Sequence, residues 1–350
     1  MHKKTLKYGI VGAGSIADKK HLNSYSSLND VELLAICDEN EERAKILADK
    51  YNIPYVFTDY RKLLDEVPLD FISVCTPNYL HESICVRALE KGIHVHCEKP
   101  AALNADSVRS IVDAKNRSGK KLMVGLNNRF TNSAFFLKNY IEQGNLGDIY
   151  HIKCGWRRRR EIPGKGSWFT NKSLSGGGPL IDLGVHMLDL VMYLTNNWQP
   201  ISVSSEVYTK FSGNTSRNSR SYGTVQDGIF DVEDMSVGFI KFKNGCTISF
   251  EFSWASNIEK VFKYYELLGD KGGAFFADEK LKLFSEFGDT LVDIYPDTNY
   301  SRDASNEFEH LLDCIRTGNE TVSPPEQAVI VMSVIDAAYA SAQTKKEIFI

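Results

Sequence analysis

The sequence contains no hydrophobic run long enough to cross a membrane, although 43% of its 350 residues are hydrophobic. A membrane-spanning helix needs about 20 consecutive apolar residues, and no segment of this chain provides them. The first residues, Met1–Lys4, lead into a short strand-like segment without the apolar stretch of a secretion signal. We therefore expect a cytoplasmic protein with no membrane partner.

Cysteine is present but forms no pattern. The seven cysteines are scattered, no two have the spacing of zinc ligands, and their arrangement does not resemble a disulfide framework. Cys37, Cys75 and Cys97 lie in or at the ends of apolar segments, where a free thiol packs as a small hydrophobic group. We expect reduced thiols and no metal site.

An excess of one charge is also lacking. The chain has 41 lysines and arginines against 45 aspartates and glutamates, a net charge of −4, and the two signs are interspersed. The basic cluster Arg157–Arg160 is too short to indicate nucleic-acid binding. The remaining composition is that of a globular protein, and the length is sufficient for about two domains.

Residues 1–126 alternate strands and helices with short connections. The segment Phe71–Cys75 is apolar at nearly every position, which is typical of a parallel strand covered on both faces. Strands are predicted at Leu6–Val11, Val31–Cys37, Phe71–Cys75, Ile93–Cys97 and Lys121–Gly125, and helices at Ile16–Leu28, Glu39–Tyr51, Leu80–Lys91 and Ala105–Ser118. This alternation predicts an α/β domain with a doubly wound parallel sheet, the Rossmann arrangement.

Residues 127–350 are expected to form a second, α+β domain with a large, open, mostly antiparallel sheet. The segment Thr247–Phe252 alternates polar and apolar residues, as in a strand with one buried face. Strands are predicted at Asp148–Arg159, Ile201–Phe211, Asp234–Phe242, Thr247–Trp254 and Lys263–Gly269, with further short ones to about Asp293, and helices at Ser133–Gln143, Pro179–Leu194, Asn306–Thr317 and Pro325–Ala342. The segment Ser212–Gly228 has the composition of a mobile hairpin loop.

The first strand leads directly into a glycine turn that opens a helix. Gly12 permits a tight turn, Gly14 lets the backbone approach a pyrophosphate, and the small Ala17 allows close helix–strand packing. Ser15 and Ile16 begin the helix, whose first N–H groups face the phosphates. The turn therefore predicts a dinucleotide-binding site.

Asp38, at the end of the second strand, favours NAD over NADP as the dinucleotide. A carboxylate there binds both ribose hydroxyls and repels a 2′-phosphate, although Arg43 can soften that preference. The alternative is that Asp38 only caps the helix that begins at Glu39.

A further loop follows the strand Phe71–Cys75, beside the predicted switch point of the sheet. Thr76, Pro77 and Asn78 stand at the edge of the cofactor crevice, and His81 lies one turn later. Each of these residues has a structural alternative: Asn78 can cap the next helix, and a structural role is as consistent with the sequence as a functional one for His81.

The strand Ile93–Cys97 ends in Glu98, Lys99 and Pro100, beside the place where a nicotinamide would project. Pro100 fixes its own φ and shapes the turn that carries Lys99, and the Lys99–Pro100 bond can be cis. The alternative is an exposed ion pair at a strand end. The location favours Glu98 and Lys99 as site residues.

The helix after Gly176–Gly178 is apolar on almost every side, yet Asp182, His186 and Asp189 recur along it at i, i+4 and i+7. Buried titratable groups are costly unless they are partnered or used, and such groups cluster in active sites. His186 has the intrinsic pKa to exchange a proton near neutral pH, and Asp182 can orient it. A structural network is the alternative, most of all for Asp189.

Together these motifs resemble the Gfo/Idh/MocA oxidoreductase family, the group that contains glucose-fructose oxidoreductase and inositol dehydrogenase. The resemblance covers essentially the whole chain and is carried by Gly12–Ala17, Thr76–Asn78, His81, Glu98–Pro100, Val124–Phe130, Gly176–Gly178, Asp182, His186 and Pro325–Glu326.

The resemblance implies an NAD-dependent dehydrogenase that moves hydride between a sugar or polyol carbon and nicotinamide. It makes Lys99, Asp182 and His186 the catalytic residues: His186 exchanges the hydroxyl proton, Lys99 donates a hydrogen bond to the developing alkoxide, and Asp182 holds both. It also implies that Asn127 binds cofactor, and that the protein is a homodimer or homotetramer assembled through the second sheet.

The substrate is the least determined part of the prediction. Trp168 can stack on a sugar or on nicotinamide, and Arg157 can bind a phosphate or carboxylate, although a solvated strand or a subunit interface explains the arginines equally well. Arg129 is a further predicted substrate-binding residue. Two other functions stay open: an NAD-dependent glycosidase of the same family, and a nucleotide sensor without catalysis, against which the presence of both Lys99 and His186 argues.

Overall fold

The computed structural model describes residues 4–213, 227–298 and 306–350, and the chain divides into two compact units. The first unit comprises Met1–Leu126 with Ser305–Ala328, and the second comprises Asn127–Ala304 with Val329–Ile350. The observed second unit therefore differs from the expected second domain of residues 127–350 in one segment, because residues 306–328 pack with the first unit. Most of the expected loop at 212–228 lies outside the described residues.

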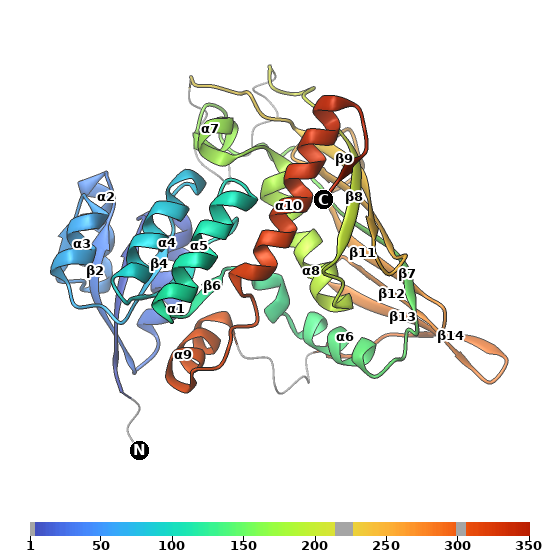
Figure 1. Cartoon of the computed structure of the whole chain (residues 1–350), viewed down its shortest axis with the longest axis horizontal. Coiled ribbons are helices and arrows are strands. Elements are labelled where there is room, and N and C mark those ends of the chain that lie inside the picture. Colours follow the sequence, from blue (N-terminus) through green and yellow to red (C-terminus); the bar gives the residue numbers. More distant parts are fainter. Residues whose placement is uncertain (1–3, 214–226, 299–305) are drawn as a thin grey trace. The chain divides into compact units, whose positions relative to one another are not determined.

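The first unit is built on a six-stranded sheet of order β3-β2-β1-β4-β5-β6, in which every neighbouring pair is parallel. Its elements are β1 (Leu6–Val11), η1 (Ala17–Leu22), α1 (Asn23–Ser26), β2 (Val31–Cys37), α2 (Glu41–Tyr51), β3 (Tyr55–Phe57), α3 (Tyr60–Glu66), β4 (Phe71–Val74), η2 (Asn78–Leu80), α4 (His81–Glu90), β5 (His94–Cys97), α5 (Ala105–Ser118), β6 (Leu122–Val124) and α9 (Glu307–Thr317) (Figure 1). This is the predicted doubly wound sheet, which is confirmed.

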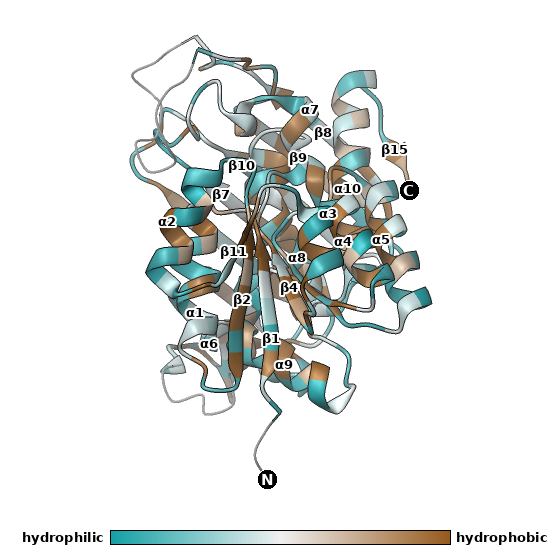
Figure 2. Cartoon of the chain, turned by 90° about the vertical axis from the view of Figure 1, so that its left-hand side faces the viewer, coloured by the Kyte–Doolittle hydropathy of each residue, from teal (hydrophilic) through white to brown (hydrophobic). Residues whose placement is uncertain are grey.

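Local sequence explains where these elements begin and end. All four positions of β4 are buried, as a strand covered on both faces requires, and β2 and β4 are largely brown in Figure 2. Helix α2 begins at Glu41 because the Asn40 side chain accepts the Arg43 N–H as its cap. Helix α5 ends at Gly119, which has a φ of 65° that favours glycine.

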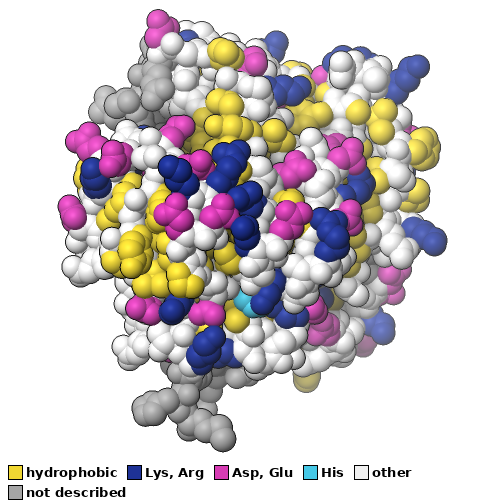
Figure 3. All heavy atoms as spheres, turned by 60° about the vertical axis from the view of Figure 1, so that its left-hand side comes forward, with side chains coloured by type: hydrophobic (Ala, Val, Ile, Leu, Met, Phe, Trp, Pro, Cys, Tyr) yellow, Lys and Arg dark blue, Asp and Glu magenta, His cyan; other side chains and the backbone are white. Residues whose placement is uncertain are grey.

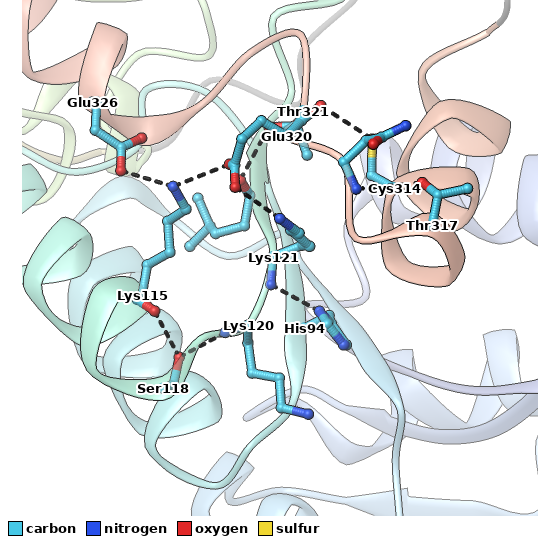
Figure 4. A network of polar contacts seen from close by, with 12 residues as sticks. His94, Lys115, Ser118, Lys120, Lys121, Cys314, Thr317, Glu320, Thr321 and Glu326 are labelled. Atoms are coloured by element: carbon cyan, nitrogen blue, oxygen red, sulfur yellow. Dashed lines mark hydrogen bonds and ion pairs between the residues drawn. The ribbon is translucent and has the colours of Figure 1, made fainter.

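Residues 306–328 complete the first unit at the β6 edge. The Val124 N–H donates to the Ser323 carbonyl at 3.0 Å, and the Ser323 hydroxyl donates to the Val124 carbonyl at 2.7 Å. Figure 4 shows the side chains of Lys115 and Lys121 reaching Glu320 and Glu326 of this segment. The segment therefore covers strand edge that would otherwise be open to pairing with another chain.

The second unit is built on a nine-stranded sheet of order β14-β13-β12-β11-β7-β10-β9-β8-β15. Only β7 and β10 pair in parallel among these neighbours, so the expected mostly antiparallel sheet is confirmed. Its elements are η3 (Asn127–Phe130), α6 (Asn132–Glu142), β7 (Ile149–Arg157), η4 (Trp168–Thr170), α7 (Lys172–Ser175), η5 (Leu180–Gly184), α8 (Val185–Thr195), β8 (Pro200–Tyr208), β9 (Met235–Phe242), β10 (Thr247–Ser253), β11 (Phe262–Gly269), β12 (Gly273–Ala277), β13 (Lys280–Phe287), β14 (Thr290–Ile294), α10 (Pro325–Thr344) and β15 (Ile348–Phe349).

The two faces of this sheet differ. Ile152, Cys154 and Trp156 of β7 point toward the helices, where α8 packs on β7, and we call this the helix face. Figure 1 shows α8 and α10 beside β8 and β9, and Ser205 of β8 bonds to α10. Alternate residues point away, onto what we call the open face.

The distribution of surface charge and the lengths of the helices are consistent with the amino-acid composition. On the side of the molecule drawn in Figure 3, positive and negative side chains are interspersed. Among the described residues, no helix is both long enough and apolar enough to cross a membrane.

Candidate active site

The carboxyl ends of β1, β4 and β5, which are neighbours in the first sheet, carry the three predicted cofactor motifs. This is the switch point where ligands bind in open α/β sheets. Gly12 has a φ of +100°, and a Cβ there would lie 2.5 Å from the Cys75 carbonyl oxygen. Only glycine therefore lets the turn after β1 pass the end of β4.

The turn and the neighbouring loop fit a dinucleotide. A Cβ at Gly14 would meet no atom within 4 Å, so open space lies where a pyrophosphate would approach the backbone. The Thr76 hydroxyl is buried and has no hydrogen-bond partner among the described residues, which a bound cofactor would supply. Ser15 and Ile16 are exposed at the start of the helical stretch.

Asp38 organises the glycine turn itself. One carboxylate oxygen accepts the Ala13 N–H at 2.8 Å, and the other accepts the Asn40 N–H at 2.9 Å. The Arg43 guanidinium lies 3.9 Å from Asp38. Because Asn40 caps α2, helix capping does not account for Asp38, whose half-buried carboxylate lies just after β2, beside the glycine turn.

His81 joins the loops that follow β4 and β5. Its ring is fully buried, with Nδ1 2.8 Å from the Pro100 carbonyl oxygen and Nε2 2.9 Å from the Thr76 carbonyl oxygen. Carbonyl oxygens only accept, so both nitrogens donate and the ring is an imidazolium. Burial opposes this charge, but Cys97 and the two carbonyls raise the pKa to about 9. The arrangement supports a bracing role, rather than direct cofactor contact.

Glu98 is also held by the protein. Its Oε1 lies 2.9 Å from His21 Nε2 and 3.8 Å from Lys20 Nζ, and its Oε2 accepts the Lys99 N–H. Burial opposes ionisation, but the hydrogen bond from His21 and the charge of Lys20 hold the Glu98 pKa well below its usual range. Glu98 therefore fixes the backbone of the turn.

Lys99 is half-buried at that turn, whereas the residues on both sides of it, from Val95 to Ala102, are buried. The Lys99–Pro100 peptide bond is cis, the isomer that the sequence left open. The turn thus presents the ammonium group of Lys99 at the end of β5.

The glycine run Gly176–Gly178 lets a buried acid anchor the helix that carries Asp182 and His186. Glu233 accepts the N–H groups of Gly178 and Leu180, each at 3.0 Å, and also the Tyr339 hydroxyl. A Cβ at Gly178 would lie 2.0 Å from the Glu233 carbonyl oxygen, so no larger residue allows this approach. The first turns form a π-helical stretch, a feature frequent at functional sites.

Asp189 holds the same helix from the other end. Its carboxylate makes a two-pronged ion pair with Arg129, both groups are buried, and the guanidinium also stacks on Tyr193 and Trp198. Burial raises the pKa of Asp189, and Arg129 opposes that rise. The ion pair agrees with the structural alternative for Asp189, and it does not support a substrate-binding role for Arg129.

Asp182 and His186 are half-buried on a helix whose other residues from Leu180 to Met192 are buried. The Trp254 indole N–H donates to Asp182 Oδ2 at 2.9 Å, and the His186 ring lies 6.0 Å from that of Trp156. Between Leu180 and Met192, a carboxylate and an imidazole are thus the side chains that keep partial exposure.

The other predicted residues have separate surroundings. Trp168 is half-buried and stacks on Phe169 with 3.8 Å between ring centres, and Asn127 is exposed at the start of the second unit. Arg157 lies on the open face, 3.2 Å from Glu251, and so points away from His186 and Trp156. This placement does not support a substrate role for Arg157 within one subunit.

Sequence reasoning missed Glu233, Trp254 and Trp156, which contact the helix of Asp182 and His186, and Lys263, whose ammonium lies 5.0 Å from the centre of the Trp156 ring. Glu233 is 55 residues from Gly178, and no local pattern links them. A weak signal was present for Lys263, because it stands in a strand with Tyr265 and Leu267 at buried positions two and four residues later.

A glycine turn at the switch point of a six-stranded parallel sheet, joined to a second α/β unit, is typical of dinucleotide-binding proteins. Residues 6–126 match the NAD-binding Rossmann fold of the Gfo/Idh/MocA oxidoreductase family, and residues 138–350 match its C-terminal alpha/beta domain. The chain belongs to this family.

Relatives cover the full length of the chain. It is 34% identical to the D-glucoside 3-dehydrogenase of Escherichia coli (strain K12), over 98% of this chain and 97% of that protein. It is 24% identical to the inositol 2-dehydrogenase of Rhizobium meliloti (strain 1021), over 99% of both chains. The structure of levoglucosan dehydrogenase in complex with NADH and levoglucosan has the same fold, with a TM-score of 0.86 at 23% identity over 98% of this chain and 99% of that chain.

Proposed function

We propose that this protein oxidises a secondary hydroxyl of a pyranose sugar, in particular the 3-hydroxyl of a glucoside, with NAD as the hydride acceptor. The observation that carries the proposal is the pair Asp182 and His186, presented half-buried on an otherwise buried and doubly anchored helix. The D-glucoside 3-dehydrogenase, similar over nearly the full length, supports the choice of substrate. A glucose-6-phosphate 3-dehydrogenase of Bacillus subtilis (strain 168), 30% identical over 54% of this chain, supports the position oxidised.

The cofactor is held by residues of the first unit. Gly12, Gly14 and Thr76 would border the pyrophosphate of bound NAD, and Asp38, beside the glycine turn, would accept hydrogen bonds from the ribose hydroxyls. NAD, when bound, takes up hydride at C4 of the nicotinamide.

The chain's own residues manage the proton. His186 accepts the hydroxyl proton as the carbon loses hydride and the carbonyl forms, and it returns the proton in reduction. Lys99 donates a hydrogen bond to the oxygen as it gains negative charge, because an ammonium stabilises a developing alkoxide. Asp182 orients the reacting groups, with one carboxylate oxygen fixed by Trp254.

An assay of the purified chain with NAD and a panel of glucosides, free sugars and inositols tests this proposal. We expect NADH and a keto-sugar from at least one glucoside, and a weaker rate with NADP. Release of the aglycone from a chromogenic nitrophenyl glucoside without net NADH would instead identify the glycosidase. Tight NAD binding with neither product would identify the sensor.

We also propose that copies of the chain assemble through the open face of the second sheet. Apolar side chains lie on this face, among them Val237, Phe239, Phe262 and Phe284, and two of these are more than one-third exposed. Arg157 would then lie in the interface. Sedimentation equilibrium should give a dimer or tetramer, and Phe239→Asp should shift it toward monomer; a monomeric wild-type protein contradicts this proposal.

We place the protein in the cytoplasm, where all seven cysteines, which are free and buried, would stay reduced.

A further inference from the structure

Lys263, on the helix face, and Asn128 of η3 form a polar pair that the proposed mechanism does not use. Lys263 of β11 is in register with Trp156 of β7, so the two side chains share a face. The Lys263 ammonium lies 5.0 Å from the centre of the Trp156 ring and donates to Asn128 Oδ1 at 3.2 Å. The same indole lies near His186, with 6.0 Å between the ring centres, so Lys263 and His186 share Trp156 as a neighbour.

The charge of Lys263 is poorly compensated within the described residues. Burial lowers the pKa of Lys263, and the carboxylate that opposes this shift, Glu279, is exposed and forms no ion pair with it. Arg158 also lies over the Trp156 ring, but unlike Lys263 it has a partner acid, Glu161, at 3.2 Å. A half-buried ammonium without a partner acid is costly, unless another acceptor meets it.

Asn128 also carries an N–H donor for which the described residues provide no acceptor. The residue is 8% exposed, its Oδ1 accepts a hydrogen bond from Lys263, and its buried Nδ2 has no hydrogen-bond partner among the described residues. Buried amide donors are almost always paired in folded proteins. The pair therefore presents N–H groups from two side chains, which favours a ligand oxygen as their acceptor.

We propose that Asn128 and Lys263 form a subsite that binds a second oxygen of the sugar, on a carbon next to the one oxidised. This inference rests on the proposed function. The subsite determines specificity: it holds the ring so that the oxidised hydroxyl meets His186, and a sugar lacking that oxygen leaves the buried Asn128 Nδ2 without an acceptor and the Lys263 charge without a ligand oxygen. The ligand class is a pyranoside with vicinal hydroxyls.

The test compares Lys263→Met and Asn128→Ala with the wild type, on a glucoside and on its 2-deoxy and 4-deoxy derivatives. We expect each variant to raise the sugar KM about tenfold or more, with the NAD KM unchanged. With one of the two deoxy sugars, the sugar KM of the wild type should rise by a similar factor. The KM of the Lys263→Met variant should not rise further with that sugar, because the contact is already lost. Lys260→Met, on an exposed lysine three residues earlier, is the matched control and should behave as the wild type.

Folding and turnover are separated from binding. Thermal unfolding checks each variant, and Lys263→Gln, which keeps a polar group, replaces Lys263→Met if that variant is unfolded. Calorimetric titration of the glucoside into the NADH-bound protein measures affinity without turnover. Binding by a wild type that makes no keto-sugar overturns the proposed function alone; affinity and deoxy-sugar discrimination that are unchanged in folded Lys263 and Asn128 variants overturn the subsite. Absence of any sugar binding overturns both.

Discussion

At the scale of single residues, His81 shows how a buried charge can be structural. The contacts of its two nitrogens with the carbonyls of Thr76 and Pro100 make the imidazolium the form that satisfies every polar atom. These carbonyls belong to the loops that end β4 and β5. A protonated His81 therefore joins the cofactor loop to the turn that carries Lys99.

This charge predicts a loss of stability in alkali. The folded pKa of about 9 lies above the usual value of 6.5, so the stabilisation is fully present below pH 6.5 and is lost as the pH rises through 9. The difference corresponds to about 3 kcal/mol. We expect the free energy of unfolding of the wild type, measured in urea, to fall over this range more steeply than that of His81→Gln. Parallel pH profiles for the two proteins would show that the ring is neutral.

At the scale of elements, the helix η5–α8 is positioned from outside itself. Glu233 binds its first N–H groups, and Arg129 holds Asp189 further along. Placing a carboxylate at the amino end of a helix also complements the helix dipole. These two anchors therefore fix the positions of Asp182 and His186, which lie between them on the helix.

The anchor can be tested at one glycine. Gly178→Ala would place a Cβ 2.0 Å from the Glu233 carbonyl oxygen, so the backbone must shift and the Glu233 bonds weaken. We expect a destabilisation of about 1–3 kcal/mol and a fall in kcat through displaced Asp182 and His186. Gly213→Ala is the control, because a Cβ there meets no atom within 4 Å. Equal behaviour of the two variants in urea unfolding and in the NADH assay would refute the role of the anchor.

The sequence predicted those features whose cause is local. The Gly12 turn, the end of α5 at Gly119 and the stripe of Asp182 and His186 follow from φ, capping and helical period. The partners of that stripe did not follow, since Arg129 meets Asp189 across 60 residues and Glu233 meets Gly178 across 55. The strand period puts Trp156 and Arg157 on opposite faces, but which of the two faces the helices follows from the packing of α8 on β7.

At the scale of the whole molecule, the chain returns to its first unit near its end. Residues 306–328 bond to β6 and form ion pairs with α5, and Lys115 meets Glu326 across 211 residues. Glu307 also pairs with Lys20 at 2.6 Å, next to the Glu98 network. The Rossmann unit is therefore discontinuous in sequence, which a boundary drawn at residue 126 overlooks.

This organisation predicts that the fragment of residues 1–126 is incomplete. It would leave the β6 edge open and Lys115 and Lys121 without their acids, so we expect a lower melting temperature and concentration-dependent association. A fusion that adds residues 306–328 through a flexible linker should restore a cooperative, monomeric unfolding transition. Identical melting and sedimentation of the two proteins would contradict the structural role of the segment.

The most direct test of the account measures turnover and cofactor binding in the same Lys99→Met and His186→Ala proteins. Steady-state NADH formation from a glucoside reports the chemistry, and quenching of tryptophan fluorescence by NADH reports binding. We predict that turnover is abolished in both variants while the NADH Kd stays within about threefold of the wild type, because neither residue holds the pyrophosphate or the ribose. Wild-type turnover in either variant would contradict the assignment of these residues to catalysis.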